Sequence, residues 1–223
     1  MSHSIKERLA DAVSRWKFGE PVIVVSGLPR SGTSMLMNML AAGGMPVFVD
    51  DQRQADLDNL KGYFEHERVK DLETDPDRSW LRQARGKAVK VVSHLLRHLP
   101  PDNRYLVLLA TRDLREVLAS QNLLLDRLNQ ANPVADDKAL RLYQRHLQNV
   151  HSLAGVRSNF RLLEVPYTEV IGAADDWSQK ISTFVGRNLD HVRMAGVVDA
   201  SLYRNRAKEG EMVTRNSIAG AAE

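Results

Sequence analysis

The sequence predicts an α/β fold, a mostly parallel sheet flanked by helices on both faces. Three observations support it. Short apolar, β-branched runs alternate with longer stretches of helical periodicity. The first run, residues 21–26, is almost continuously apolar, as expected of a strand buried on both faces. A glycine loop and a helical pattern follow it directly, which is the order of a phosphate-binding βα unit of the nucleotide-binding type.

Length and composition favour one domain. The chain has 223 residues, 43% of them hydrophobic, enough for a single substantial core. We therefore expect one α/β domain over residues 1–206 and a disordered tail over 207–223, where periodicity is lost. The net charge of +3 is spread along the chain, so we expect a local anion site and no nucleic-acid partner. The absence of cysteine excludes disulfides, thiolate metal sites and cysteine nucleophiles.

The N-terminal segment predicts a packing helix. Apolar residues recur at helical spacing over residues 3–17, without the apolar core of a signal peptide. No stretch has the length of a membrane span. We expect a cytoplasmic protein without a membrane span, and the sequence leaves a homodimer open.

Further elements alternate along the chain. The helix after the glycine loop covers residues 34–42 and stops at two glycines. Later strands are predicted over residues 46–49, 87–92, 104–110 and 160–165, and helices over 68–74, 113–128 and 138–156. Residues 50–77 are polar, and we expect a partly helical excursion over the carboxyl edge of the sheet, where such folds place substrates.

The glycine loop carries the strongest functional signal. Gly27 and Gly32 have the GxxxxG spacing of a phosphate-binding loop. We expect an anion to bind at the helix start, on the amides of four consecutive residues, Ser31, Gly32, Thr33 and Ser34. Thr33 stands where ATP-binding loops have lysine, and Arg30 supplies a cation ahead of the second glycine. This arrangement suits a phosphate-sulfate group, without a required metal, better than a magnesium triphosphate.

These residues resemble a known family. The string of residues 28–34, Leu-Pro-Arg-Ser-Gly-Thr-Ser, is similar to the 5′-phosphosulfate loop of the sulfotransferase superfamily. Arg112 and Ser120 match the family's arginine and serine for the 3′-phosphate, with the same eight-residue separation. The resemblance implies 3′-phosphoadenosine-5′-phosphosulfate (PAPS) as sulfuryl donor, adenosine 3′,5′-bisphosphate (PAP) as product, and a hydroxyl or amine acceptor on a small molecule or carbohydrate. Residues 113–116 also form a capping box, which accounts for that stretch without a ligand but does not explain Arg112.

Three further positions follow from the resemblance. Tyr167 is similar to a tyrosine that the family places near the adenine, although a packing role explains an aromatic residue there equally well. Arg204 and Arg206 occupy the position of the family's C-terminal phosphate clamp. The glycine-rich spacing that usually accompanies this clamp is missing.

Two residues are candidates for the catalytic base. Sulfuryl transfer to a hydroxyl needs a group that accepts the acceptor's proton. Glu65 stands on the polar excursion beside aromatic residues, and His94 follows a predicted strand in a stretch similar to the family's lysine-threonine-histidine element. We favour Glu65 slightly. The alternative roles are a carboxylate opening a helix for Glu65 and a surface histidine for His94.

Two other functions remain open on the sequence alone. A magnesium-dependent small-molecule or nucleotide kinase could use the glycine loop with Ser34 and the acids Asp50 and Asp51. A nucleotide-binding protein without catalysis could keep the loop and lack the base.

Overall fold

The computed structural model describes residues 17–50, 64, 66–130 and 134–202. Several sequence predictions lie outside these residues: most of the helix over 3–17, the candidate base Glu65, the acid Asp51, the arginines Arg204 and Arg206, and the tail over 207–223. The single domain over 1–206 therefore stays a prediction for the chain as a whole. None of the helices among the described residues is both long and apolar enough to cross a membrane.

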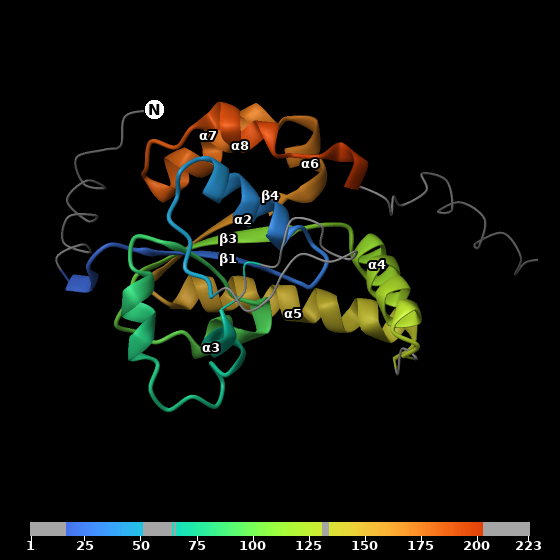
Figure 1. Cartoon of the computed structure of the whole chain (residues 1–223). Helices are drawn as coiled ribbons and strands as arrows, with labels where there is room; N and C mark the ends of the chain where they lie inside the picture. Colours follow the sequence, from blue (N-terminus) through green and yellow to red (C-terminus); the bar gives the residue numbers. More distant parts are fainter. Residues whose placement is uncertain (1–16, 51–63, 65, 131–133, 203–223) are drawn as a thin grey trace, which may run out of the picture.

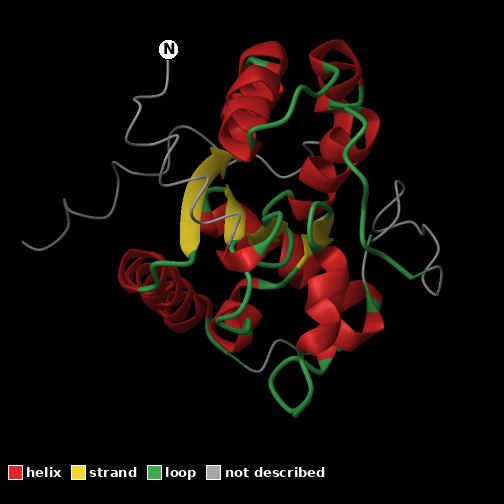
Figure 2. Cartoon of the chain, turned by 90° about the vertical axis from the view of Figure 1, so that its left-hand side faces the viewer, coloured by secondary structure: helices red, strands yellow, loops and turns green. Residues whose placement is uncertain are grey.

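The described chain is built on a four-stranded sheet. All strands are parallel, in the order β2-β1-β3-β4, which confirms the predicted fold class. Val25 in the centre pairs with Lys90 on one side and Leu108 on the other. Figure 2 shows the strands in the middle of the molecule with helices on either side. The bounds are β1 Val22–Gly27, β2 Ala88–Lys90, β3 Tyr105–Thr111 and β4 Phe160–Pro166.

Helices form a layer on each face of the sheet, and α4 lies beyond its carboxyl edge (Figure 1). One layer holds α2 (Thr33–Ala42), α6 (Tyr167–Gly172), α7 (Ala174–Val185) and α8 (His191–Gly196). The other holds α3 (Glu67–Lys70), α5 (Asp136–Val156) and the 3-10 helices η1 (Ser79–Ala84) and η2 (Ser93–His98). The remaining helices are α4 (Leu114–Arg127) and the short η3 (Ala200–Leu202).

Two hydrophobic clusters hold these layers to the sheet. In β1, Val22 and Val24 face the cluster under α5, whereas Ile23 and Val25 face the cluster under α2 and α7. All four side chains are fully buried. Each contributes on the order of 1.5–3 kcal/mol relative to an exposed side chain, which explains why this strand is continuously apolar.

The structure corrects two sequence predictions and adds helices that the sequence analysis missed. Residues 46–49 form no strand, because their pairing with β2 is limited to one bridge, between Val47 and Ala88. The helix predicted over 68–74 ends at Lys70, and the amide of Thr74 bonds the carbonyl oxygen of Asp71 in a separate turn. The helices after residue 166 were not predicted.

The parallel strands bring four connections to one edge of the sheet. The glycine loop follows β1, η2 follows β2, Arg112 and α4 follow β3, and Tyr167 opens α6 after β4. Because the carboxyl ends of parallel strands share one edge, residues from 27 to 167 can meet there.

Candidate functional site

Neighbouring atoms come so close to Gly27 and Gly32 that neither position has room for a side chain. A Cβ at Gly27 would collide with the Ser31 hydroxyl and would lie 2.8 Å from the carbonyl oxygen of Ala110 in β3. Gly32 has a positive φ of 108°, and a Cβ there would lie 2.6 Å from Cδ2 of Tyr167. The GxxxxG spacing therefore reflects two contacts across the carboxyl edge of the sheet.

The loop amides divide into two groups. The N–H and the hydroxyl of Ser31 both donate to the carbonyl oxygen of Leu28, at 3.2 and 2.7 Å, so Ser31 closes the loop internally. The amides of Gly32 and Thr33 donate to no acceptor within the part of the chain that the structure describes. They stand at the start of α2, whose first turn carries no acidic residue and whose N-cap has no side-chain hydrogen bond. Unpaired amides at the positive end of a helix dipole form a surface that suits an anion.

Arg30 links the loop to α4. Its backbone has a positive φ of 70°, unusual for a residue with a side chain. Its Nε donates to the hydroxyl oxygen of Ser120 at 3.0 Å. Ser120 is 6% exposed, and a hydroxyl that accepts one hydrogen bond keeps its own proton to donate.

Arg112 joins the same cluster from the end of β3. Its Nε donates to Oε2 of Glu116 at 2.8 Å in a pair with side chains 7% and 4% exposed. Its Nη1 lies 3.5 Å from the carbonyl oxygen of Arg30, at the limit for a hydrogen bond. Asp113 caps α4, accepting from the amides of Arg115 and Glu116. Of the capping box predicted over 113–116, the hydrogen bonds to the Asp113 side chain are thus present. The Glu116 side chain instead accepts a hydrogen bond from Arg112.

Tyr167 packs against both Arg112 and the glycine loop. The guanidinium carbon of Arg112 lies 4.8 Å from the centre of its ring, and the ring edge fills the space beside Gly32. Burial raises the pKa of the Tyr167 phenol, against the opposing effect of the Arg112 charge. The Tyr167 ring is only 7% exposed, and its cation–π contact holds the Arg112 guanidinium in its orientation.

His94 stands apart from this cluster. It is exposed on η2, at the carboxyl end of β2. Beside it, the buried hydroxyl of Ser93 lies 2.8 Å from Nε2 of His146 on α5. Burial, followed by the charges of His94 and Arg97, lowers the pKa of His146. A neutral imidazole is therefore favoured next to His94.

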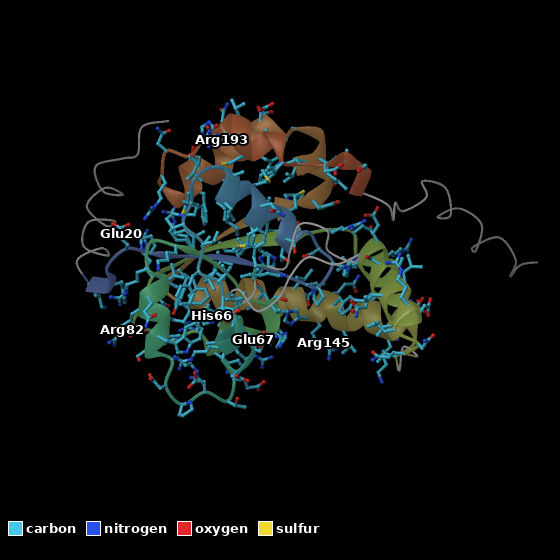
Figure 3. All side chains as sticks on the ribbon, viewed as in Figure 1. Glu20, His66, Glu67, Arg82, Arg145 and Arg193 are labelled. Carbon is cyan, nitrogen blue, oxygen red and sulfur yellow. The ribbon has the colours of Figure 1, made fainter. Side chains whose placement is uncertain are left out.

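Asp50 belongs to a different arrangement under the sheet. Its carboxylate accepts the amide of Glu67 at 2.7 Å and lies 3.8 Å from Nδ1 of His66. The His66 ring lies nearly parallel to the rings of Phe48 and Trp80, with ring centres 4.5 and 5.2 Å away, and the three rings form one cluster. Figure 3 shows His66 and Glu67 below the sheet, where α3 begins. Asp50 therefore anchors the chain where α3 begins.

Of the residues predicted for the site, the structure brings together the loop residues 30–34 with Arg112, Ser120 and Tyr167. It places His94 on the same edge, and among the described residues no hydrogen bond or ion pair joins its side chain to them. Glu65, Arg204 and Arg206 lie outside the described residues. The sequence analysis missed Glu116, although its position four residues after Arg112 is the helical spacing of an ion pair.

Comparisons with known proteins give matches at the level of structure. No family model matches the sequence, and no curated protein matches it. Among solved structures, the sulfotransferase domain of the Synechococcus PCC 7002 olefin synthase is similar, with 18% identity, a TM-score of 0.46, and coverage of 84% of this chain and 83% of that one.

Mouse sulfotransferase SULT7A1, crystallised in complex with PAP, is also similar. The identity is 15% and the TM-score 0.43, over 80% of this chain. The match spans 62% of the mouse chain, less than two thirds of its length. Both superpositions are loose, and we draw the function from the glycine loop and its neighbours.

Proposed function

We propose that this chain is a sulfotransferase that moves the sulfuryl group of PAPS to a hydroxyl or amine acceptor. The observation that carries the proposal is that Arg30, Arg112 and Ser120 are joined to one another at the glycine loop, whose Gly32 and Thr33 amides have no acceptor among the described residues. Two cations and a set of backbone donors on one edge of the sheet suit a ligand with two separate anionic groups.

The two groups of the ligand would be held by different elements. The amides of Gly32, Thr33 and Ser34, with the guanidinium of Arg30, would bind the 5′-phosphosulfate. Arg112 and the Ser120 hydroxyl would bind the 3′-phosphate, and Ser31 would maintain the loop's shape. In this proposal Tyr167 orients Arg112, and Arg204 and Arg206 complete the phosphate contacts. No metal is needed, because guanidinium groups and helix amides provide the positive charge.

The chemical step requires one proton acceptor and one charge stabiliser. A base removes the proton of the acceptor hydroxyl, the acceptor oxygen forms a bond to sulfur, and the bond between sulfur and the phosphate oxygen breaks. The products are a sulfate ester and PAP. Arg30 would stabilise the charge that develops on the departing phosphate. Glu65 and His94 remain the two candidates for the base.

A magnesium-dependent kinase is the second candidate, and the loop itself argues against it. The position of the phosphate-binding lysine is held by Thr33, and Asp50 is engaged with the Glu67 amide. A nucleotide-binding protein without catalysis remains the third.

Calorimetry separates the three. PAP binding in the presence of EDTA supports the sulfotransferase, and binding of magnesium-ATP alone supports the kinase. Binding of neither ligand would remove both. Binding of PAP without transfer to any of a panel of sugar, phenol and alcohol acceptors would favour the non-catalytic protein.

Single-turnover assays of variants test the proposed roles of Arg30 and of the two candidate bases. Arg30→Ala is expected to abolish transfer in a protein that remains folded by circular dichroism. For the base, Glu65→Gln and His94→Gln are compared at saturating PAPS, with exposed His151→Gln on α5 as control. An undiminished rate for either variant clears that residue.

A further inference from the structure

A hollow at the opposite edge of the sheet is lined by three arginines. Its volume is about 580 Å³. We call it the arginine hollow and define it by Arg78, Arg97 and Arg157, with Ser79, His98 and Asp102 beside them. Asp102 precedes β3 and Arg157 precedes β4, so the hollow lies at the amino edge of the sheet. The glycine loop follows β1 at the carboxyl edge and shares no residue with it.

The three guanidinium groups are held by main-chain oxygens. Arg78 donates to the carbonyl oxygens of Leu72 and Glu73, at 2.7 and 3.2 Å. Within the described ranges, no carboxylate pairs with any of the three arginines. A guanidinium has five N–H donors, so these contacts fix the groups in place without neutralising them. The other contacts are Arg97 to the carbonyl oxygen of His94 and Arg157 to those of Arg97 and Leu99.

Arg157 carries a charge that burial disfavours. Burial lowers the pKa of its guanidinium, and the nearby Tyr105 only partly opposes this effect. The Phe160 ring, 4.6 Å from the guanidinium carbon, and the carbonyl oxygen of Leu99 at 2.9 Å hold the group in position. A fixed, partly desolvated cation gains most from an anion that binds to it directly.

The nearby carboxylates are already engaged with other groups. Asp102 accepts from Nε of Arg82 at 2.7 Å, and Arg82 does not line the hollow. Glu73 lies 3.7 Å from Nε2 of His98. Asp77 is a further nearby acid, and its carboxylate accepts the amide of Ser79 at 2.9 Å. Among the residues that line the hollow, three arginines stand against one acid, Asp102, so the formal charge of the lining is positive.

We infer that the arginine hollow binds a small molecule through a phosphate or sulfate ester group. Planar guanidinium groups donate two parallel hydrogen bonds to such oxyanions, and the exposed hydroxyl of Ser79 adds a neutral donor. The volume leaves room for a group of sugar size next to the ester. The inference uses no residue of the proposed nucleotide site, so either can fail without the other.

The test is calorimetry with glucose 6-phosphate, glucose 6-sulfate and glucose at constant ionic strength. Both esters are expected to bind saturably and glucose is not. The phosphate ester is expected to bind more tightly because it carries more charge at neutral pH. Tighter binding of glucose 6-sulfate than of glucose 6-phosphate would assign the hollow to sulfate esters. Binding of neither ester above glucose would overturn the inference.

Variants locate the binding. Arg97→Gln removes an exposed guanidinium with one main-chain contact, and at least a tenfold loss of affinity is expected. Arg145→Gln, an exposed site on α5 that does not line the hollow, is the control and should change affinity less than twofold. Figure 3 shows Arg145 well apart from Arg82, the partner of the lining residue Asp102. Equal affinities for wild type and Arg97→Gln, or loss of binding in Arg30→Ala instead, would place the ester elsewhere and overturn the inference.

Discussion

The Nε of Arg30 and the hydroxyl oxygen of Ser120 lie 3.0 Å apart, although 90 residues separate them in the chain. This contact joins the glycine loop after β1 to the helix after β3. The two elements bring together the cation proposed for the 5′ end of PAPS and the hydroxyl proposed for its 3′-phosphate. Adjacent parallel strands therefore set the distance between the two proposed anion subsites.

Ser120→Ala should weaken PAP binding by about tenfold or more, since a hydrogen bond to a charged group contributes roughly 1.5–3 kcal/mol. The variant removes the hydroxyl from both Arg30 and the ligand. Calorimetry measures the loss, and Ser152→Ala at an exposed position of α5 is the control. Unchanged affinity would remove Ser120 from the phosphate site.

Gly32→Ala should destabilise the protein by roughly 1–3 kcal/mol, because alanine must adopt a positive φ and its Cβ meets the Tyr167 ring. PAP binding should weaken as well, since the loop amides move. Gly155→Ala is a matched control: no atom lies within 4 Å of a Cβ there, and within α5 the change should stabilise by about 0.5–1 kcal/mol. Urea unfolding compares the two, and equal stabilities would contradict the close approach at Gly32.

Glu116→Gln should destabilise the ligand-free protein by about 3 kcal/mol, because Arg112 loses its buried counter-charge. Saturating PAP should recover part of this loss, since a phosphate supplies negative charge at the same guanidinium. Thermal unfolding with and without PAP measures both effects. Exposed Glu169→Gln is the control. A larger PAP-induced shift in wild type than in Glu116→Gln would argue against phosphate at Arg112.

The free energy of unfolding should fall at alkaline pH because of the buried phenol of Tyr105. Burial raises the pKa of its phenol far above the ordinary value of 10.0. The stability that neutral Tyr105 contributes is complete below pH 10 and is lost as the pH rises further, because the unfolded chain releases a proton that the folded chain keeps.

Tyr105→Phe tests this dependence. The variant loses the hydrogen bond to the carbonyl oxygen of Pro100, worth about 1 kcal/mol at neutral pH, and should show a flatter decline between pH 9 and 11. Tyr143→Phe on α5 is the control. Parallel declines for Tyr105→Phe and wild type would assign the alkaline loss to other groups.

The sequence was sufficient for the elements that bury apolar residues in a regular pattern. β1, α2, β3, α4, α5 and β4 were predicted because their periodicity and glycine stops are local signals. The strand over 46–49 was wrong because β-branched residues alone do not secure a pairing partner. The apolar spacing of Trp177, Ile181 and Val185 marks α7 clearly, and this local signal was missed.

In the candidate site, too, local sequence signals predicted some residues, whereas contacts between distant segments were not predictable. The glycine spacing predicted the loop, and a family resemblance suggested Arg112 and Ser120. Contacts between distant segments left no pattern in the sequence: Ser93 meets His146 across 53 residues, and Tyr167 fills the space beside Gly32. The closing of the loop by Ser31 depends on backbone geometry that residue types alone do not specify.

The most direct test of the proposed site is a crystal structure of the protein with PAP. We expect the 5′-phosphate on the amides of Gly32 and Thr33 with Arg30 beside it, and the 3′-phosphate between Arg112 and Ser120. A nucleotide bound away from the glycine loop, or one whose 3′-phosphate contacts neither residue, would contradict the account.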